Sequence, residues 1–162
     1  MRLSQKLNLW QKLLKKKMSK LVVINQDAKI GKNVKIDSFS SIHENVIIGD
    51  NCWIGSNVTI YPGARIGANC QIFPGAVISA IPQDLKFQGE NTTVVIGENV
   101  IIRECVTINR GTSHSNTTIV GDNTFLMAYS HVAHDCVINN NVIIANGVAI
   151  AGHVEIDEYA II

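Results

Sequence analysis

The chain has 162 residues, a length typical of a single domain, and 46% of them are hydrophobic, which suffices for a buried core. Its formal net charge is only +1, but seven of the fourteen Lys and Arg residues lie within residues 1–20, which contain no acid. The remainder carries a formal charge of −6. Gly, Asn or Asp interrupts every apolar run, so no signal peptide or transmembrane segment is expected and the protein is predicted to be cytoplasmic.

Residues 1–20 are predicted to form a short basic amphipathic helix, because Leu3, Leu7, Trp10 and Leu14 recur at helical spacing among basic residues. One interpretation places this helix on an anionic membrane surface. The other, which we favour, is an upstream extension of a protein whose true start is Met18. In both cases residues 1–20 are expected to be separate from a domain spanning residues 21–162.

An aliphatic residue recurs at every sixth position from Ile24 to Ile162, where twenty-one of twenty-four positions carry Ile, Val or Leu. Neither a helix nor an isolated strand sustains this period, whereas a β-helix does. Asn and Gly recur between the aliphatic residues and tolerate a positive φ, so each hexapeptide is expected to end in a corner. Three faces make one coil of eighteen residues, and coils stack at about 4.8 Å. The pattern therefore predicts an all-β solenoid of short parallel strands.

The four cysteines are consistent with a reducing compartment. Cys52 and Cys70 are eighteen residues apart, so they are expected to stack inside the column, within reach of a disulfide. We interpret them, together with Cys136, as small core thiols, and we expect Cys105 to lie exposed at a corner. The sequence contains no CxxC pair, so the cysteines indicate neither a zinc site nor a redox site.

Two irregular stretches interrupt the repeat and predict loops at residues 79–95 and 109–119, where Asp84, Glu90 and His114 occupy aliphatic positions. Loops inserted in a solenoid often bind ligands, although both could be solvated excursions without a role. In the first stretch, Asp84 and Lys86 beside apolar Leu85 suit a polyanionic or sugar ligand. The second stretch indicates no particular role.

Histidines concentrate in the last third of the chain, and their spacing predicts a site. His134 and Gly152 are eighteen residues apart, as are Asp135 and His153, so each pair is expected to occupy one corner on adjacent coils. Such a site suits acyl transfer to a hydroxyl or amine. His134 would act as the general base, Asp135 would fix its tautomer, and the Gly152 N–H would stabilise an oxyanion.

Two other interpretations of the histidines stay open. His131 and His134 could be ordinary polar corner residues, although their register with Gly152 favours a site. Alternatively, His131, His134 and His153 could supply three imidazoles to zinc. His43 and His114 lie off this register, and we interpret them as surface residues.

Four stretches carry a resemblance to a known family: 81–86 (IPQDLK), 102–112 (IRECVTINRGT), 131–136 (HVAHDC) and 151–153 (AGH). In this order they resemble the acyl-carrier-protein–UDP-N-acetylglucosamine O-acyltransferases, which begin lipid A synthesis in Gram-negative bacteria. The sequence of the first stretch is similar to that found in the Bacteroidetes branch of the family. The resemblance covers residues 22–162.

The resemblance implies a left-handed parallel β-helix and a homotrimer with active sites between neighbouring columns. It implies transfer of a 3-hydroxyacyl group from the carrier-protein thioester to the 3-hydroxyl of UDP-N-acetylglucosamine (UDP-GlcNAc). His134, Asp135 and Gly152 match the catalytic positions, whereas the substrate positions are matched by Gln83, Asp84, Lys86, His131 and His153. No cofactor, metal ion or nucleic acid is expected.

The family continues beyond the equivalent of Ile162, so we expect this chain to be a fragment with an uncapped strand edge and weak or absent turnover. The nearest rival is the N-acyltransferase of the same pathway, but its N-terminal uridine-binding domain has no counterpart here. A metal-dependent lyase of the γ-carbonic anhydrase type belongs to another class. An ice-binding prism would need an outward array of threonines, which the sequence lacks.

Overall fold

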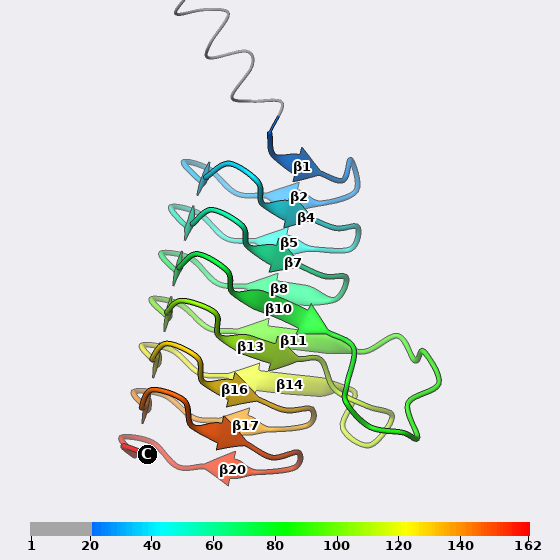
Figure 1. Cartoon of the computed structure of the whole chain (residues 1–162), viewed down its shortest axis with the longest axis vertical. Coiled ribbons are helices and arrows are strands. Elements are labelled where there is room, and N and C mark those ends of the chain that lie inside the picture. Colours follow the sequence, from blue (N-terminus) through cyan, green and yellow to red (C-terminus); the bar gives the residue numbers. More distant parts are fainter. Residues whose placement is uncertain (1–20) are drawn as a thin grey trace, which may run out of the picture.

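The computed structural model describes residues 21–162, and the helix expected over residues 1–20 lies outside the described residues. Short strands joined by tight turns wind into a tall column (Figure 1). Residues 21–162 contain strands and turns only, so this part of the chain has no helix able to cross a membrane. The all-β expectation is confirmed for the described residues.

The strands form three parallel sheets, one on each face of the column, and every third strand belongs to the same sheet. The first sheet contains β1 (Val23–Ile24), β4 (Ser41–Ile42), β7 (Thr59–Ile60), β10 (Val77–Ala80), β13 (Thr107–Asn109), β16 (His131–Val132) and β19 (Ala149–Ile150). The second contains β2 (Lys29–Ile30), β5 (Ile47–Ile48), β8 (Ala64–Ile66), β11 (Thr93–Ile96), β14 (Thr117–Val120), β17 (Val137–Ile138) and β20 (Glu155–Ile156). The third contains β3 (Lys35–Ile36), β6 (Trp53–Ile54), β9 (Gln71–Ile72), β12 (Ile101–Ile102), β15 (Phe125–Leu126) and β18 (Ile143–Ile144).

The strand register confirms a coil of eighteen residues. In the first sheet Ser41 pairs with Thr59, and near the other end His131 pairs with Ala149, eighteen residues later in each case. In the second sheet, Arg65 pairs with Val95 and Val95 pairs with Ile119. These separations of thirty and twenty-four residues show that one coil carries twelve extra residues and the next carries six.

The repeated aliphatic side chains point into the column and form its core. Ile60, Ile78 and Ile108 stack in the first sheet, and each is completely buried. The corner asparagines, such as Asn51 with φ 60°, adopt the left-handed conformation that the sequence predicts. The glycine after the aliphatic residue meets a different need: a Cβ at Gly49 would lie 2.7 Å from the backbone of the adjacent coil.

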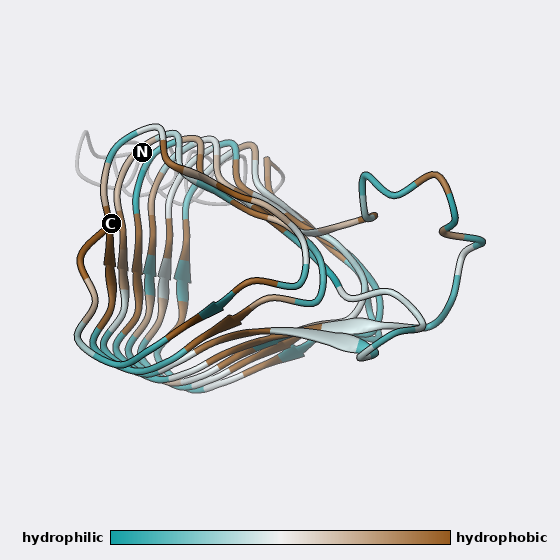
Figure 2. Cartoon of the chain, turned by 90° about the horizontal axis from the view of Figure 1, so that it is seen from below, coloured by the Kyte–Doolittle hydropathy of each residue, from teal (hydrophilic) through white to brown (hydrophobic). Residues whose placement is uncertain are grey.

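Both sets of extra residues leave the column at one corner. The first loop (residues 81–92) joins β10 to β11, and the second loop (residues 110–116) joins β13 to β14. Each loop therefore crosses from the first sheet to the second, and Figure 2 shows both projecting from the same corner. The predicted interruptions of the repeat are confirmed, and the topology places them side by side.

The cysteines lie where the sequence places them. Cys52, Cys70 and Cys136 are buried free thiols in the core, whereas Cys105 is an exposed free thiol at a corner. Burial raises the pKa of the Cys136 thiol, as expected for an inert core residue.

Candidate functional site

The candidate site lies at the corner where the chain leaves the first sheet, beginning one coil after the second loop. His134 and Asp135 follow β16, and Gly152 and His153 follow β19 on the next coil. The two corners are in register, because the His153 N–H donates to the carbonyl oxygen of His134 at 3.1 Å. The predicted stacking of the two pairs is therefore confirmed, while their roles in catalysis stay predictions.

The imidazole of His134 lies directly over Gly152. A Cβ at Gly152 would approach Cε1 of His134 to 2.7 Å and Nε2 to 2.8 Å, so only glycine leaves room for the ring. Within residues 21–162 the Gly152 N–H donates no hydrogen bond. The corner thus brings an imidazole nitrogen and an available backbone donor together.

Asp135 fixes the tautomer of His134. Nδ1 of His134 lies 2.8 Å from Oδ2 of Asp135, whose side chain is completely buried. An ionised carboxylate can only accept, so the proton belongs on Nδ1 and Nε2 carries the free lone pair. His134 is thereby oriented as a base, with Nε2 over Gly152.

The second loop holds the Asp135 carboxylate. Thr112 donates its N–H to Oδ1 at 2.9 Å and its hydroxyl to Oδ2 at 2.6 Å, and Ser115 donates its N–H and its hydroxyl to Oδ1. Burial by itself raises the pKa of Asp135, but the hydrogen bonds from Ser115, Thr112 and His134 outweigh it and hold the pKa well below its usual range. Asp135 therefore stays ionised inside the protein.

His153 and His114 continue the site outward from His134. The His153 ring lies edge-on to the His134 ring, with centroids 5.0 Å apart, and its Nδ1 is 3.9 Å from Oδ2 of Asp135. The ring of His114, from the second loop, packs edge-on against His153 at 4.7 Å. His114 is exposed, as expected of a surface residue, and it also lies at the site, because loop insertion carries it there outside the eighteen-residue register.

A cavity of about 270 Å³ lies between the two loops and this corner. Its walls are formed by both loops and by one corner histidine: Asp84, Lys86, Phe87, Glu90, Thr112, Ser113, His114 and His153. Three of the predicted substrate residues, Asp84, Lys86 and His153, thus line one cavity. Gln83 is outside its lining, and Leu85 at the loop tip is fully exposed.

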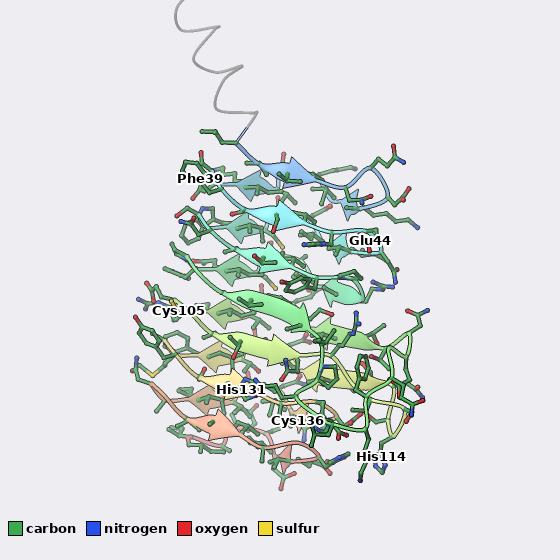
Figure 3. The ribbon with its side chains drawn as sticks, turned by 45° about the vertical axis from the view of Figure 1, so that its right-hand side comes forward. Phe39, Glu44, Cys105, His114, His131 and Cys136 are labelled. Atoms are coloured by element: carbon green, nitrogen blue, oxygen red, sulfur yellow. The ribbon has the colours of Figure 1, made fainter. Side chains whose placement is uncertain are left out.

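His131 lies on β16, on the strand face rather than in this cavity, and Figure 3 shows it well separated from His114 on the second loop. Its Nδ1 is 2.7 Å from the hydroxyl of Thr107 on the preceding coil. Burial lowers the pKa of His131, which favours the neutral imidazole.

The metal interpretation of the histidines meets an obstacle in the same geometry. His134, Asp135 and His153 offer ligand atoms within 4.8 Å of one another, whereas His131 is not part of this group. However, Oδ1 of Asp135 accepts from Thr112 and Ser115, and Oδ2 accepts from Thr112 and His134. These bonds occupy the lone pairs that a metal ion would need, so the carboxylate is arranged to orient an imidazole.

Three members of the site, Thr112, His114 and Ser115, were not predicted from the sequence. All lie in the second loop, for which the sequence favoured neither a function nor the absence of one. The sequence feature that could have identified them is the insertion itself, because an insertion one coil before His134 leaves the column at the corner where His134 lies.

Comparison with known proteins places the chain in a family. The model of the bacterial transferase hexapeptide family, described as six repeats, matches residues 27–52, 45–80 and 117–152. These ranges cover more than half of the chain, which therefore belongs to the bacterial transferase hexapeptide family.

Within this family, the chain is most usefully compared with individual acyltransferases. An acyl-[acyl-carrier-protein]–UDP-N-acetylglucosamine O-acyltransferase from Campylobacter concisus is 52% identical over 87 residues, which are 52% of this chain and 33% of that protein. The solved UDP-N-acetylglucosamine acyltransferase from Bacteroides fragilis is 55% identical with a TM-score of 0.86, over 87% of this chain and 55% of that one. The enzyme from Francisella novicida is 45% identical with a TM-score of 0.86, over 87% of this chain and 52% of that one. The predicted resemblance is thus confirmed, and this chain spans about half the length of the solved relatives.

Substitution of Gly152 by Ala is expected to displace the His134 ring, because the new Cβ would lie 2.7 Å from Cε1. Imidazole NMR signals of His134 should shift, and its hydrogen bond to Asp135 should weaken. Gly147→Ala is the matched control: its Cβ would meet nothing within 4 Å, although φ of +71° adds backbone strain. Equal effects of the two variants on His134 would contradict the close approach at Gly152.

Substitution of Ser115 by Ala is expected to make the protein more acid-sensitive. The lowered pKa of Asp135 means that the folded state binds fewer protons than the unfolded chain, so its stabilisation is present above the ordinary aspartate range and lost as the pH falls through the native pKa. Removing the Ser115 hydroxyl raises that pKa, costs about 1.5–3 kcal/mol at neutral pH and moves acid unfolding to higher pH. Urea midpoints measured from pH 7 downward would show this.

Ser113→Ala provides the matched control for Ser115→Ala. Ser113 lies in the same loop and is exposed, and its side chain makes no hydrogen bond to Asp135. Identical acid unfolding of the two variants would show that the Ser115 hydroxyl does not hold the carboxylate.

Proposed function

We propose that this chain carries the catalytic centre of an O-acyltransferase that moves a 3-hydroxyacyl group from acyl carrier protein to the 3-hydroxyl of UDP-GlcNAc, the first step of lipid A biosynthesis. The observation that supports it most directly is the corner where Nε2 of His134 faces Gly152 while Nδ1 is held by buried Asp135. Acyl carrier protein and UDP-N-acetylglucosamine come from the names of the relatives.

The chemistry follows from the orientation of His134. Nε2 takes the proton of the sugar 3-hydroxyl as its oxygen attacks the thioester carbonyl carbon. The Gly152 N–H stabilises the oxyanion of the tetrahedral intermediate, and Asp135 stabilises the imidazolium that forms. When the carbon–sulfur bond breaks, the imidazolium returns the proton to the leaving thiolate. No covalent enzyme intermediate is required.

The cavity between the loops suits the sugar nucleotide. Its lining includes the carboxyl group of Asp84 and the amine of Lys86, both from the first loop, and the imidazole of His153 at the corner. Gln83 and His131 complete the proposed substrate residues by their match to the family. By likeness to this family, we propose that the whole enzyme is a homotrimer of left-handed parallel β-helices, that its acyl donor is acyl carrier protein and that it is cytoplasmic.

The rival functions fit less well. A metal-dependent lyase fits less well because His131 does not join the group of His134 and His153, and hydrogen bonds occupy the oxygens of Asp135, the third member of that group. The relative from Campylobacter concisus carries the name of an O-acyltransferase rather than an N-acyltransferase. O-acyl transfer is therefore the function that the geometry supports best.

Replacement of His134 by Ala should greatly slow acyl transfer. The assay combines UDP-GlcNAc with a 3-hydroxyacyl carrier-protein thioester. Two forms of the protein are assayed separately: the chain as printed, and a hybrid in which it is continued by the rest of the Bacteroides fragilis protein, of which this chain spans 55%. In the active form, loss of the general base is expected to lower kcat about 10²- to 10⁴-fold.

His43→Ala is the control for this experiment, because His43 packs against Tyr61 on an early coil and takes no part in the site. It should leave kcat unchanged. Retained activity in His134→Ala would remove that residue from the mechanism, and a hybrid that transfers no acyl group would contradict the proposed function.

A further inference from the structure

The second loop supplies the site with a third imidazole, beyond His134 and His153. We infer that His114 is a positioning residue: it holds the ring of His153 in place at the wall of the cavity and so sets the affinity for the sugar nucleotide. The effect on the ligand rests on the proposed function, whereas the effect on the His153 ring does not.

His153 needs such a support because its own hydrogen bonds do not fix it. Its side chain is 49% exposed, and its Nδ1 lies 3.9 Å from Oδ2 of Asp135, beyond hydrogen-bond distance. Within residues 21–162 no hydrogen bond to the His153 ring is formed. The orientation of the ring therefore depends on what packs against it.

Two rings pack against it, both edge-on. The His134 ring lies 5.0 Å away at 88°, and the His114 ring lies 4.7 Å away at 85°. Perpendicular ring pairs at these separations are mutually attractive. His134 is anchored by Asp135, so one neighbour of His153 is fixed by the core and the other is supplied by the loop.

The loop places His114 through the same residue that holds Asp135. The Thr112 hydroxyl accepts from the His114 N–H at 3.2 Å and donates to Oδ2 of Asp135 at 2.6 Å. The backbone at His114 and the buried carboxylate are thus ordered by one side chain. A loop built to hold Asp135 also delivers an imidazole to His153.

The side chains of His114 and His153 line the cavity that we assign to UDP-GlcNAc, together with Lys86 of the first loop. If His114 were absent, the half-exposed His153 ring would lose its outer neighbour and turn away from the ligand. An aromatic contact of this kind corresponds to about a two- to tenfold change in affinity.

The test compares His114→Ala and His114→Phe in the chain as printed, with His43→Ala as control, since His43 is another ring-stacked histidine and lies two coils before the first loop. Carbon-13 relaxation of the His153 imidazole measures ring mobility, and titration with UDP-GlcNAc measures affinity. His114→Ala should free the His153 ring and weaken binding about two- to tenfold. His114→Phe keeps a ring at that place and should restore both.

The outcomes separate the inference from the proposed function. Unchanged His153 mobility in His114→Ala would overturn the positioning role whether or not the chain binds UDP-GlcNAc. A His114→Phe variant that restores the ring but not the affinity would also overturn it, because His114 would then contact the ligand directly. Increased mobility in a chain that shows no UDP-GlcNAc binding would support the ring contact and count against the proposed substrate.

Discussion

Every contact at the candidate site depends on adjacent coils stacking in register. Backbone hydrogen bonds between parallel strands and the inward ladder of buried isoleucines fix that register over the described residues. Since the side chains of one coil lie directly above those of the next, His134 and Gly152 meet although eighteen residues separate them. A slip of one residue would turn aliphatic side chains outward, so the core that stabilises the column also enforces the geometry of the site.

Asp135 shows how the column and its loops cooperate. A buried carboxylate is costly unless several donors surround it, and the column alone supplies His134 and no hydroxyl to the carboxylate. The second loop supplies Thr112 and Ser115, which keep Asp135 ionised, and an ionised Asp135 keeps the His134 proton on Nδ1. The insertion that interrupts the repeat is thus what makes a corner histidine into an oriented base.

The sequence predicts the column and part of the site because both follow from a fixed period. Counting by eighteen brings His134 to Gly152 and Asp135 to His153, and two breaks in the aliphatic repeat locate the loops. Counting fails inside the loops, since an irregular backbone has no register, and so His114, Thr112 and Ser115 could not be assigned. The residues of the first loop and the resemblance to the acyltransferases both indicated Asp84 and Lys86, but only the folded structure shows them sharing a cavity with His114.

The tautomer of His134 is the most direct measure of whether the stacked corner forms an oriented base. Nitrogen-15 NMR of the imidazole at neutral pH distinguishes a proton on Nδ1 from one on Nε2. A proton on Nδ1, with Nε2 bare above Gly152, is expected from the hydrogen bond to buried Asp135. A proton on Nε2 would mean that Asp135 does not hold the ring, and general-base catalysis by His134 would be contradicted.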